Sequence, residues 1–238
     1  MYILLARHGQ TEDNVRGIIQ GHKDTPLNDH GRLESSRLAE RLRKFEIFEA
    51  HSSPLSRARE TAEIVLQHHP DLTLTLADGL KERGLGSLEG RRREKGEKVP
   101  ADAESVNSLA ARSKAWFDSF LALHKPKGPL PSSSPFKHFR RSSHHHPTDQ
   151  PVPEPIILVV SHGAWLGSFL SLVLSSAYRF GLASHVDPRL PCYNTSLMVL
   201  RCKWVDGKWK GSVDDWGDIK HLEDMMDEEV KEVTDDVR

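Results

Sequence analysis

The hydrophobic and polar positions of this chain form short apolar runs separated by longer amphipathic stretches. Four short runs have the composition of strands, and the sequence places them at Tyr2–Ala6, Ile47–Ser52, Leu72–Leu76 and Ile156–Val160. Near the end of the chain, the stretches Thr195–Trp204 and Lys208–Val213 flank Asp206-Gly207. Because Asp-Gly favours a tight turn between antiparallel strands, this segment predicts a β-hairpin.

Helical periodicity separates these strands. We expect helices over about Gly31–Lys44, Ser56–Gln67, Ser105–His124 and Ala164–Leu174. Asp29 is placed to cap the first of them. The segments His8–Asp29 and Leu80–Gly90 are expected to be irregular, because glycines interrupt both. Strands that alternate with helices predict an α/β fold, a three-layer α/β/α sandwich with a mostly parallel central sheet.

The chain has 238 residues, which suffice for one α/β domain with a well-buried core. We expect this domain to span residues 1–221. Residues 126–155 are rich in proline, serine and histidine and predict a low-complexity surface insert. Residues 222–238 are acidic and are interpreted as a C-terminal tail.

Charge and cysteine content narrow the function. The 33 Lys+Arg residues balance 34 Asp+Glu residues, which argues against a general nucleic-acid-binding protein. The two cysteines form no CxxC pattern, so no zinc site is indicated. Few cysteines and no signal-peptide pattern favour the cytoplasm. The longest apolar region, Ile156–Ala183, is interrupted by polar residues, so we expect no membrane span.

Two histidines follow predicted strands. Arg7-His8-Gly9 ends the first apolar run, and His162-Gly163 comes directly after another run. If these strands are neighbours in a parallel sheet, both imidazoles lie at its carboxyl edge, where open α/β folds build their sites. The arginine beside His8 points to phosphate, since a guanidinium binds phosphate oxygens through two parallel hydrogen bonds.

This arrangement predicts phosphoryl transfer. His8 is the candidate nucleophile, because a neutral imidazole can form a covalent phosphohistidine. Arg7, Arg57 and His162 are expected to hold the phosphate oxygens, and Glu82 to protonate the leaving oxygen. Gly163, like Gly9, would let the backbone approach the substrate closely. No metal or cofactor is expected, because arginines and imidazoles supply the positive charge.

Each motif alone has an ordinary structural explanation, such as a solvated charge or a hydrogen-bonding histidine. The combination of these motifs and their order along the chain indicate the protein family more strongly than any one of them. The set resembles the histidine phosphatase superfamily, also called the phosphoglycerate mutase-like family. The residues that carry this resemblance are Arg7-His8-Gly9-Gln10-Thr11-Glu12-Asp13-Asn14, Gln20-Gly21, Pro26-Leu27-Asn28, Gly31, Ser53-Pro54-Leu55-Ser56-Arg57-Ala58-Arg59-Glu60-Thr61, Glu82-Arg83, Gly86, Glu89-Gly90 and Val159-Val160-Ser161-His162-Gly163.

The resemblance implies a phosphoglycerate mutase-like fold over Tyr2 to about Val205, apart from the insert rich in proline, serine and histidine. By motif position it implies that His8 is phosphorylated and that Glu82 donates the proton. Arg7, Arg57 and His162 would form the phosphate pocket. The resemblance also implies that the substrate side of the pocket is lined by Asn14, Gln20 and Gly21.

A narrower likeness points to the TIGAR-type fructose-2,6-bisphosphatase branch. It is carried by Ala164-Trp165 after the second histidine, by Asn194-Thr195, and by the long insert before His162. Gly84-Leu85-Gly86 lacks the tyrosine common there in the mutases, which favours a hydrolase. The expected partner is a small phosphorylated metabolite, a sugar (bis)phosphate such as fructose 2,6-bisphosphate. The alternatives are a phosphoglycerate mutase and a non-catalytic interaction protein with the same fold.

Overall fold

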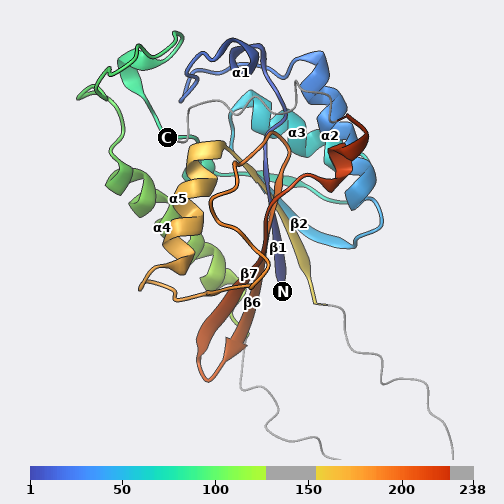
Figure 1. The fold of residues 1–238 in the computed structure, drawn as a ribbon. Coiled ribbons are helices and arrows are strands. Elements are labelled where there is room, and N and C mark those ends of the chain that lie inside the picture. The colour runs from blue at the N-terminus through green and yellow to red at the C-terminus, as the bar shows by residue number, and fades with distance from the viewer. Residues whose placement is uncertain (127–153, 226–238) are drawn as a thin grey trace, which may run out of the picture.

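The computed structural model describes residues 1–126 and 154–225, built around one central sheet (Figure 1). Within these residues the sheet has seven strands, in the order β3-β2-β4-β1-β6-β7-β5. Their bounds are Tyr2–Arg7 (β1), Ile47–Ser52 (β2), Leu74–Leu76 (β3), Ile156–Ser161 (β4), Gly181–Leu182 (β5), Leu197–Val205 (β6) and Lys208–Asp218 (β7). Strands β3, β2, β4 and β1 are parallel, whereas β6 is antiparallel to both β1 and β7. The sheet is therefore mostly parallel, as predicted.

Helices cover both faces of this sheet, with α2 and α3 on one side and α4 and α5 on the other (Figure 1). The helices are Glu12–Arg16 (α1), Asp29–Leu42 (α2), Ser56–Leu66 (α3), Val106–Leu123 (α4) and Gly163–Leu174 (α5), with 3-10 turns at Asp78–Leu80 (η1), Gly86–Leu88 (η2) and Lys220–Met225 (η3). The predicted three-layer sandwich is confirmed. Across the described parts of the chain, no helix is both long and apolar enough to cross a membrane.

Strand β1 supplies side chains to two separate cores. Ile3 and Leu5 pack with α4 and α5, whereas Leu4 and Ala6 pack with α2 and α3. Successive side chains of a strand point to opposite faces, so a strand covered on both faces must be apolar throughout. Each fully buried aliphatic side chain of this kind contributes about 1.5–3 kcal/mol. The continuous apolar run in the sequence is the direct consequence.

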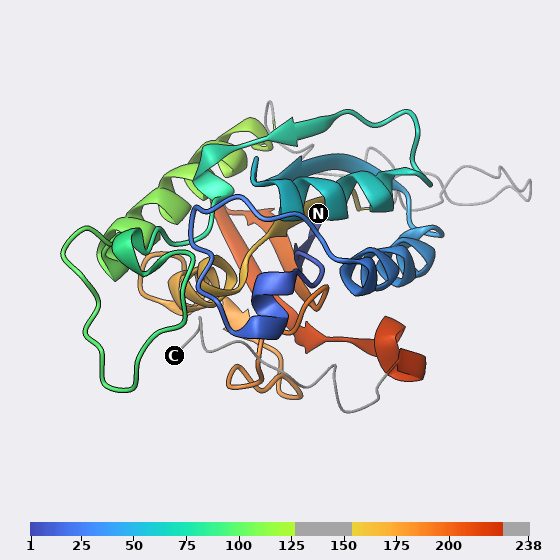
Figure 2. The same ribbon diagram turned by 90° about the horizontal axis from the view of Figure 1, so that it is seen from above.

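The register of β1 against β4 brings the two histidine motifs together. Arg7 lies opposite Ser161, so His8 and His162 leave the sheet at the same edge. The backbone N–H of His8 donates to the Ser161 carbonyl at 3.0 Å. Seen from above, α1 lies over this carboxyl edge (Figure 2). The expected neighbourhood of the two strands is confirmed.

Three local features differ from the expectations. Helix α1 lies inside the stretch 8–29 expected to be irregular, and its five residues are too few for an apolar period. The sequence feature that marks α1 is the N-cap residue Thr11, whose Oγ1 accepts from the Asn14 N–H at 3.1 Å. Helix α2 is capped by Asn28, whose Oδ1 accepts from the Gly31 N–H, and Asp29 is its first helical residue. The two-residue strand β5 carried no pattern in the sequence.

The expected insert and tail lie largely outside the described residues, at 127–153 and 226–238. The residues that border them are packed. Pro155 accepts a hydrogen bond from the Tyr2 N–H at 2.8 Å, so the end of the expected insert joins the start of β1. Leu222 in η3 is fully buried. The boundary expected at residue 222 therefore falls inside a packed turn.

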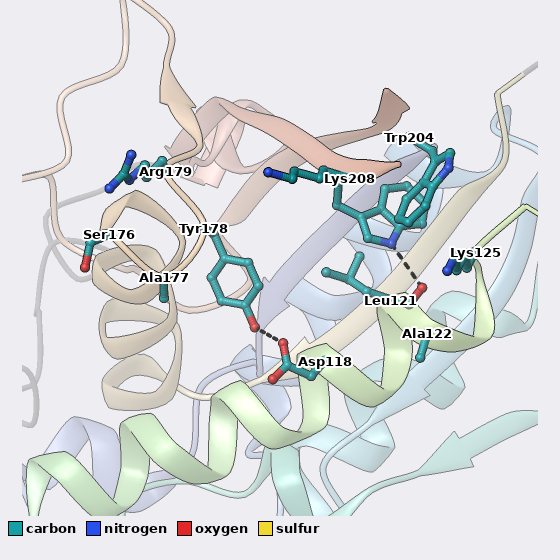
Figure 3. Close-up of a pocket in the computed structure, with 11 residues that line it drawn as sticks. Asp118, Leu121, Ala122, Lys125, Ser176, Ala177, Tyr178, Arg179, Trp204 and Lys208 are labelled. Atoms are coloured by element: carbon teal, nitrogen blue, oxygen red, sulfur yellow. Dashed lines mark hydrogen bonds between the residues drawn. The ribbon is translucent and has the colours of Figure 1, made fainter. Parts of the chain in front are cut away.

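A hollow of about 560 Å³ lies beside the β6–β7 hairpin (Figure 3). The pairing of β1 with β6 places it at the end of the sheet opposite to His8. It is bordered by α4, the turn after α5 and the β6–β7 hairpin, and Trp204 and Trp209 form part of its wall. The Tyr178 hydroxyl donates to Asp118 at 2.6 Å, and Lys125 lies over the Trp204 ring. Its cationic side chains are solvent-exposed, in contrast to the buried arginines beside His8.

Candidate active site

His8 sits directly after β1 and is almost completely buried. Its Nδ1 lies 2.7 Å from the Gly9 carbonyl oxygen. Since a carbonyl can only accept, Nδ1 carries the proton and Nε2 keeps its lone pair. Burial, followed by the nearby Arg57 and Arg7 guanidiniums, holds the pKa of His8 well below its usual range. The ring is therefore neutral at physiological pH, the form that can attack phosphorus.

His162 follows β4, and its ring centroid lies 5.1 Å from that of His8. Its Nε2 is 2.8 Å from Ser53 Oγ, which already accepts from the Leu55 N–H. We therefore assign the Ser53 O–H as the donor to Nε2, which leaves the proton of the neutral ring on Nδ1. That Nδ1 is buried and has no hydrogen-bond partner among the described residues. His162 thus presents an N–H donor where His8 presents a lone pair.

Two buried arginines supply positive charge. Arg7 Nη1 donates to the Cys192 carbonyl at 2.7 Å. Arg57 donates to the carbonyls of Lys23 and Gly21 at 2.9 and 2.8 Å. Backbone carbonyls fix both side chains, and guanidiniums stay protonated in proteins. Both charges act on His8, since both lower its pKa.

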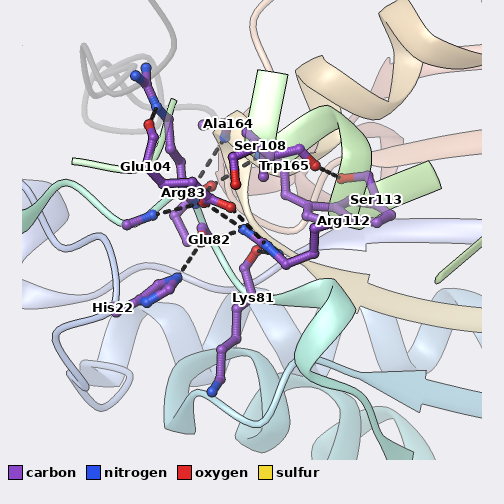
Figure 4. A network of polar contacts seen from close by, with 12 residues as sticks. His22, Lys81, Glu82, Arg83, Glu104, Ser108, Arg112, Ser113, Ala164 and Trp165 are labelled. Carbon is purple, nitrogen blue, oxygen red and sulfur yellow. Dashed lines mark hydrogen bonds and ion pairs between the residues drawn. The ribbon is translucent and has the colours of Figure 1, made fainter. Parts of the chain in front are cut away.

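Glu82 lies at the N-terminus of α5 (Figure 4). Its Oε1 accepts from the Trp165 N–H at 2.9 Å and from the Arg83 N–H at 2.8 Å, and its Oε2 from the Ala164 N–H at 3.1 Å. The backbone N–H groups in the first turn of a helix lack intrahelical partners, and the oxygens of the Glu82 carboxyl group accept from two of them. Ala164 follows His162 by two positions, so this carboxyl group is held beside the second histidine.

Asn14 and Gln20, both expected on the substrate side, are buried in the segment that follows Gly9. Asn14 Oδ1 accepts from the Thr11 N–H at 3.1 Å. Its Nδ2 is buried without a hydrogen-bond partner in the described structure. A buried unsatisfied donor is costly, so Asn14 Nδ2 is available to an acceptor atom of a bound ligand.

The two glycines expected in the site have different places. Gly21 adopts φ +50°, and a Cβ there would lie 2.1 Å from Glu89 Oε1. A side chain at this position would be strained in the left-handed region and would displace the Glu89 carboxylate, and the carbonyl of Gly21 holds Arg57. Gly163 is buried as the first residue of α5, between His162 and the amide groups that hold Glu82.

Sequence reasoning did not assign site roles to Ser53 and Asn194. Asn194 Nδ2 donates to the His8 carbonyl at 2.9 Å, and Ser53 contacts His162. The position of each residue in the sequence could have indicated its place in the site. Ser53 follows β2 at the same carboxyl edge, and Asn194 leads into β6, which runs antiparallel to β1 and so begins at that edge.

Together these groups can bind a phosphate ester and place its phosphorus next to His8 Nε2. The arginines, His162 Nδ1 and Asn14 Nδ2 would contact the phosphate oxygens, which need charge stabilisation during phosphoryl transfer. In residues 1–126 and 154–225 no group of three or more His, Cys, Asp or Glu side chains is arranged to hold a metal ion.

Comparisons with curated proteins find relatives along most of the chain. A probable phosphatase of Schizosaccharomyces pombe is 26% identical and covers 94% of this chain and 96% of its own length. A phosphoglycerate mutase-like protein of Arabidopsis thaliana is 32% identical, with 93% and 87% covered. A probable phosphoglycerate mutase of Proteus mirabilis is 30% identical, with 97% and 99% covered.

Solved structures share the fold. A structure named mycobacterial hydrolase 1 superposes with a TM-score of 0.69 at 23% identity and covers 91% of this chain and 98% of its own. The mycobacterial glucosyl-3-phosphoglycerate phosphatase superposes with a TM-score of 0.68 at 24% identity, with the same coverage. The family comparison matches residues 3–130. This chain therefore belongs to the histidine phosphatase superfamily (branch 1) and is an enzyme of that superfamily.

Proposed function

We propose that this enzyme is a metal-independent phosphatase that hydrolyses a small phosphorylated metabolite through a phosphohistidine on His8. One observation carries the proposal. The rings of His8 and His162 are buried and neutral, and their centroids lie 5.1 Å apart. His8 has a free lone pair on Nε2, whereas His162 has an N–H donor on Nδ1. A nucleophile beside a fixed donor, with two arginines adjacent, suits an attack on phosphorus.

The reaction has two steps. In the first, His8 Nε2 forms a bond to phosphorus as the bond to the leaving oxygen breaks, and the Glu82 carboxyl gives that oxygen its proton. In the second, water attacks phosphorus and the electron pair of the N–P bond returns to Nε2. Glu82, now a carboxylate, takes a proton from the water. Inorganic phosphate leaves and both residues regain their initial states.

The substrate class proposed is a sugar (bis)phosphate, with fructose 2,6-bisphosphate as the first compound to test. The resemblance to the TIGAR-type branch supports this choice. The name of the glucosyl-3-phosphoglycerate phosphatase with the same fold also supports a small phosphate ester as substrate. A phosphoglycerate mutase is the second candidate, because curated relatives at 30% identity carry that name. Both candidates use the phosphohistidine and differ in whether water or bound product accepts the phosphoryl group.

The test measures phosphate release in EDTA from phosphorylated sugars, glycerate phosphates and a phosphotyrosine peptide. We expect release from sugar phosphates by the wild-type enzyme and none by His8→Ala. Interconversion of phosphoglycerates without release would favour the mutase. Full activity of a folded His8→Ala variant would refute the mechanism, and inactivity of the wild-type enzyme in both assays would favour a non-catalytic interaction protein.

A further inference from the structure

The segment that carries Glu82 has no regular structure of its own. Residues 81–85, between η1 and η2, contain neither helix nor strand. A proton donor must be held within about 0.5 Å of its productive position, and sites on loops are less precise than sites on helices or strands. Contacts from other elements must therefore fix the backbone of Glu82.

Arg112, on α4, makes these contacts through backbone carbonyls (Figure 4). Its Nη1 donates to the Lys81 carbonyl at 2.7 Å and to the Gly79 carbonyl at 3.2 Å. Its Nη2 donates to the carbonyl of Glu82 itself at 3.0 Å. One planar guanidinium therefore holds the backbone on the N-terminal side of the Glu82 carboxyl group, with a charge-assisted bond at each carbonyl.

Glu104, just before α4, completes the arrangement. It accepts from Arg112 Nε at 3.0 Å and from Nη2 at 2.8 Å, a two-point pair of partly buried side chains. Its Oε2 also accepts from the Gly84 N–H at 3.2 Å, and its carbonyl accepts from Arg83 Nε at 2.8 Å. Glu104 therefore holds the C-terminal side of the same loop while it orients Arg112.

His22 gives the Glu82 carbonyl a second donor. Its Nε2 lies 2.7 Å from that oxygen, so Nε2 carries a proton. A Cβ at residue 84 would lie 3.3 Å from the His22 ring, which leaves little space for a side chain there. The loop is thus held by the segment 20–25 on one side and by α4 on the other.

We propose that Arg112, oriented by Glu104, is a positioning residue that fixes the proton donor Glu82 against α5. The proposal rests on the proposed function, because Glu82 donates a proton only in that mechanism. Arg112 contacts backbone oxygens of the loop, and we assign it no contact with the reacting atoms. Its loss should affect the step that needs Glu82 and spare steps that do not.

The leaving group separates these steps. A p-nitrophenolate leaves without protonation, whereas an alcohol needs the proton of Glu82. We expect Arg112→Ala to lower kcat/KM for a sugar phosphate by roughly 10²-fold, while kcat/KM for p-nitrophenyl phosphate falls less than about 3-fold, because kcat/KM reports the steps up to formation of the phosphoenzyme and not its hydrolysis, in which Glu82 acts as the base. Glu82→Gln should show the same selectivity. Adding Arg112→Ala to Glu82→Gln should cost little more, because both changes remove one function.

Matched variants keep this test interpretable. Lys114→Ala, on the same helix, removes an exposed ion pair with Asp118 and should leave both substrates unaffected. Glu104→Gln keeps the shape and loses the charge of the partner. If Arg112→Ala does not fold, Glu104→Gln should show the same selectivity with a smaller loss.

Three outcomes would overturn the proposal: equal losses on both substrates, no loss on either, or fully additive losses with Glu82→Gln. Failure of the proposed function looks different. In that case the wild-type enzyme releases no phosphate from either substrate, or His8→Ala remains active, and both are measured before the Arg112 variants.

Discussion

The ends of β1 and β4 look alike in sequence, but their histidines are hydrogen-bonded through opposite ring nitrogens. Each strand is an apolar run followed by His-Gly, and each histidine is buried at the carboxyl edge. His8 is tied at Nδ1 by the carbonyl of Gly9, whereas His162 is tied at Nε2 by the hydroxyl of Ser53. One ring therefore presents a lone pair and the other an N–H.

The difference comes from the neighbours of the two rings. A carbonyl can only accept, so it forces a proton onto the ring nitrogen it contacts, whereas a hydroxyl can donate. Low pKa values keep both rings neutral, owing first to burial and then to the Arg57 charge. In a neutral imidazole one fixed nitrogen determines the role of the other.

The largest effect is expected for His8→Asn. An amide keeps polar contacts but has no nucleophilic nitrogen, so activity should fall by on the order of 10⁴-fold or more. No acid-labile phosphoenzyme should be trapped when the variant is mixed with labelled substrate and quenched in base. A trapped phosphohistidine in this variant would place the nucleophile elsewhere, and an unchanged circular dichroism spectrum would verify folding.

Substitution of His162, at the end of β4, should lower activity far less than substitution of His8. His162→Ala removes a fixed donor and should lower kcat by about 10²–10³-fold, as for other oxyanion donors. His162→Asn keeps an N–H donor on a side chain of similar reach and should recover most of this loss. Both variants should still form the phosphoenzyme. If Asn is no better than Ala at residue 162, the donor role is wrong.

A further feature of the β1 end is the buried Glu34, which accepts from the Gln10 N–H at 2.7 Å. Burial raises the pKa of Glu34 to about 7. The pKa of Glu34 is higher in the folded than in the unfolded state, so protonated Glu34 makes its full contribution to the free energy of unfolding below about pH 4.5. This contribution is lost as the pH rises towards 7, by about 3 kcal/mol. Glu34→Gln should remove this slope, measured by urea unfolding at pH 5 to 8 against wild type. If the free energies of unfolding of wild type and Glu34→Gln change in parallel with pH, the prediction is wrong.

The smallest effect is expected for Ser53→Ala, which removes the hydroxyl that fixes His162. The ring keeps its place in the core but loses its preferred tautomer, so kcat should fall by about 10-fold.

Because the pKa values of both histidines are lowered, kcat/KM should not fall as the pH drops through 6.5 in wild type. A loss centred near pH 6.5 would show that one of the rings is not buried as described.

The fold could be predicted where burial imposes a simple pattern. Strands β1 and β4 are covered on both faces, so their sequences are continuously apolar and easy to recognise. Helix α1 and strand β5 were missed, because five and two residues are too short to show a period. A cap at Thr11 and hydrogen bonds to β7 stabilise these elements, and neither appears as hydrophobic periodicity.

The candidate site could be predicted only as far as side chains reveal it. The two histidines were paired because parallel strands end at one edge. The groups that set their tautomers were not assigned, because one is the backbone oxygen of Gly9 and another, Ser53, lies 109 residues from His162. Asn194 reaches the His8 carbonyl across 186 residues. Contacts of such separation depend on the assembled sheet.

The order of the strands also has a consequence for self-association. The sheet ends in its two shortest strands, β3 with three residues and β5 with two. A short edge offers few unpaired N–H and C=O groups to a strand of another molecule. The part of β7 that extends past β5 carries Lys208 and Lys210, and lysines on an edge oppose strand addition. This placement of short and charged edges protects the folded enzyme against aggregation through its sheet.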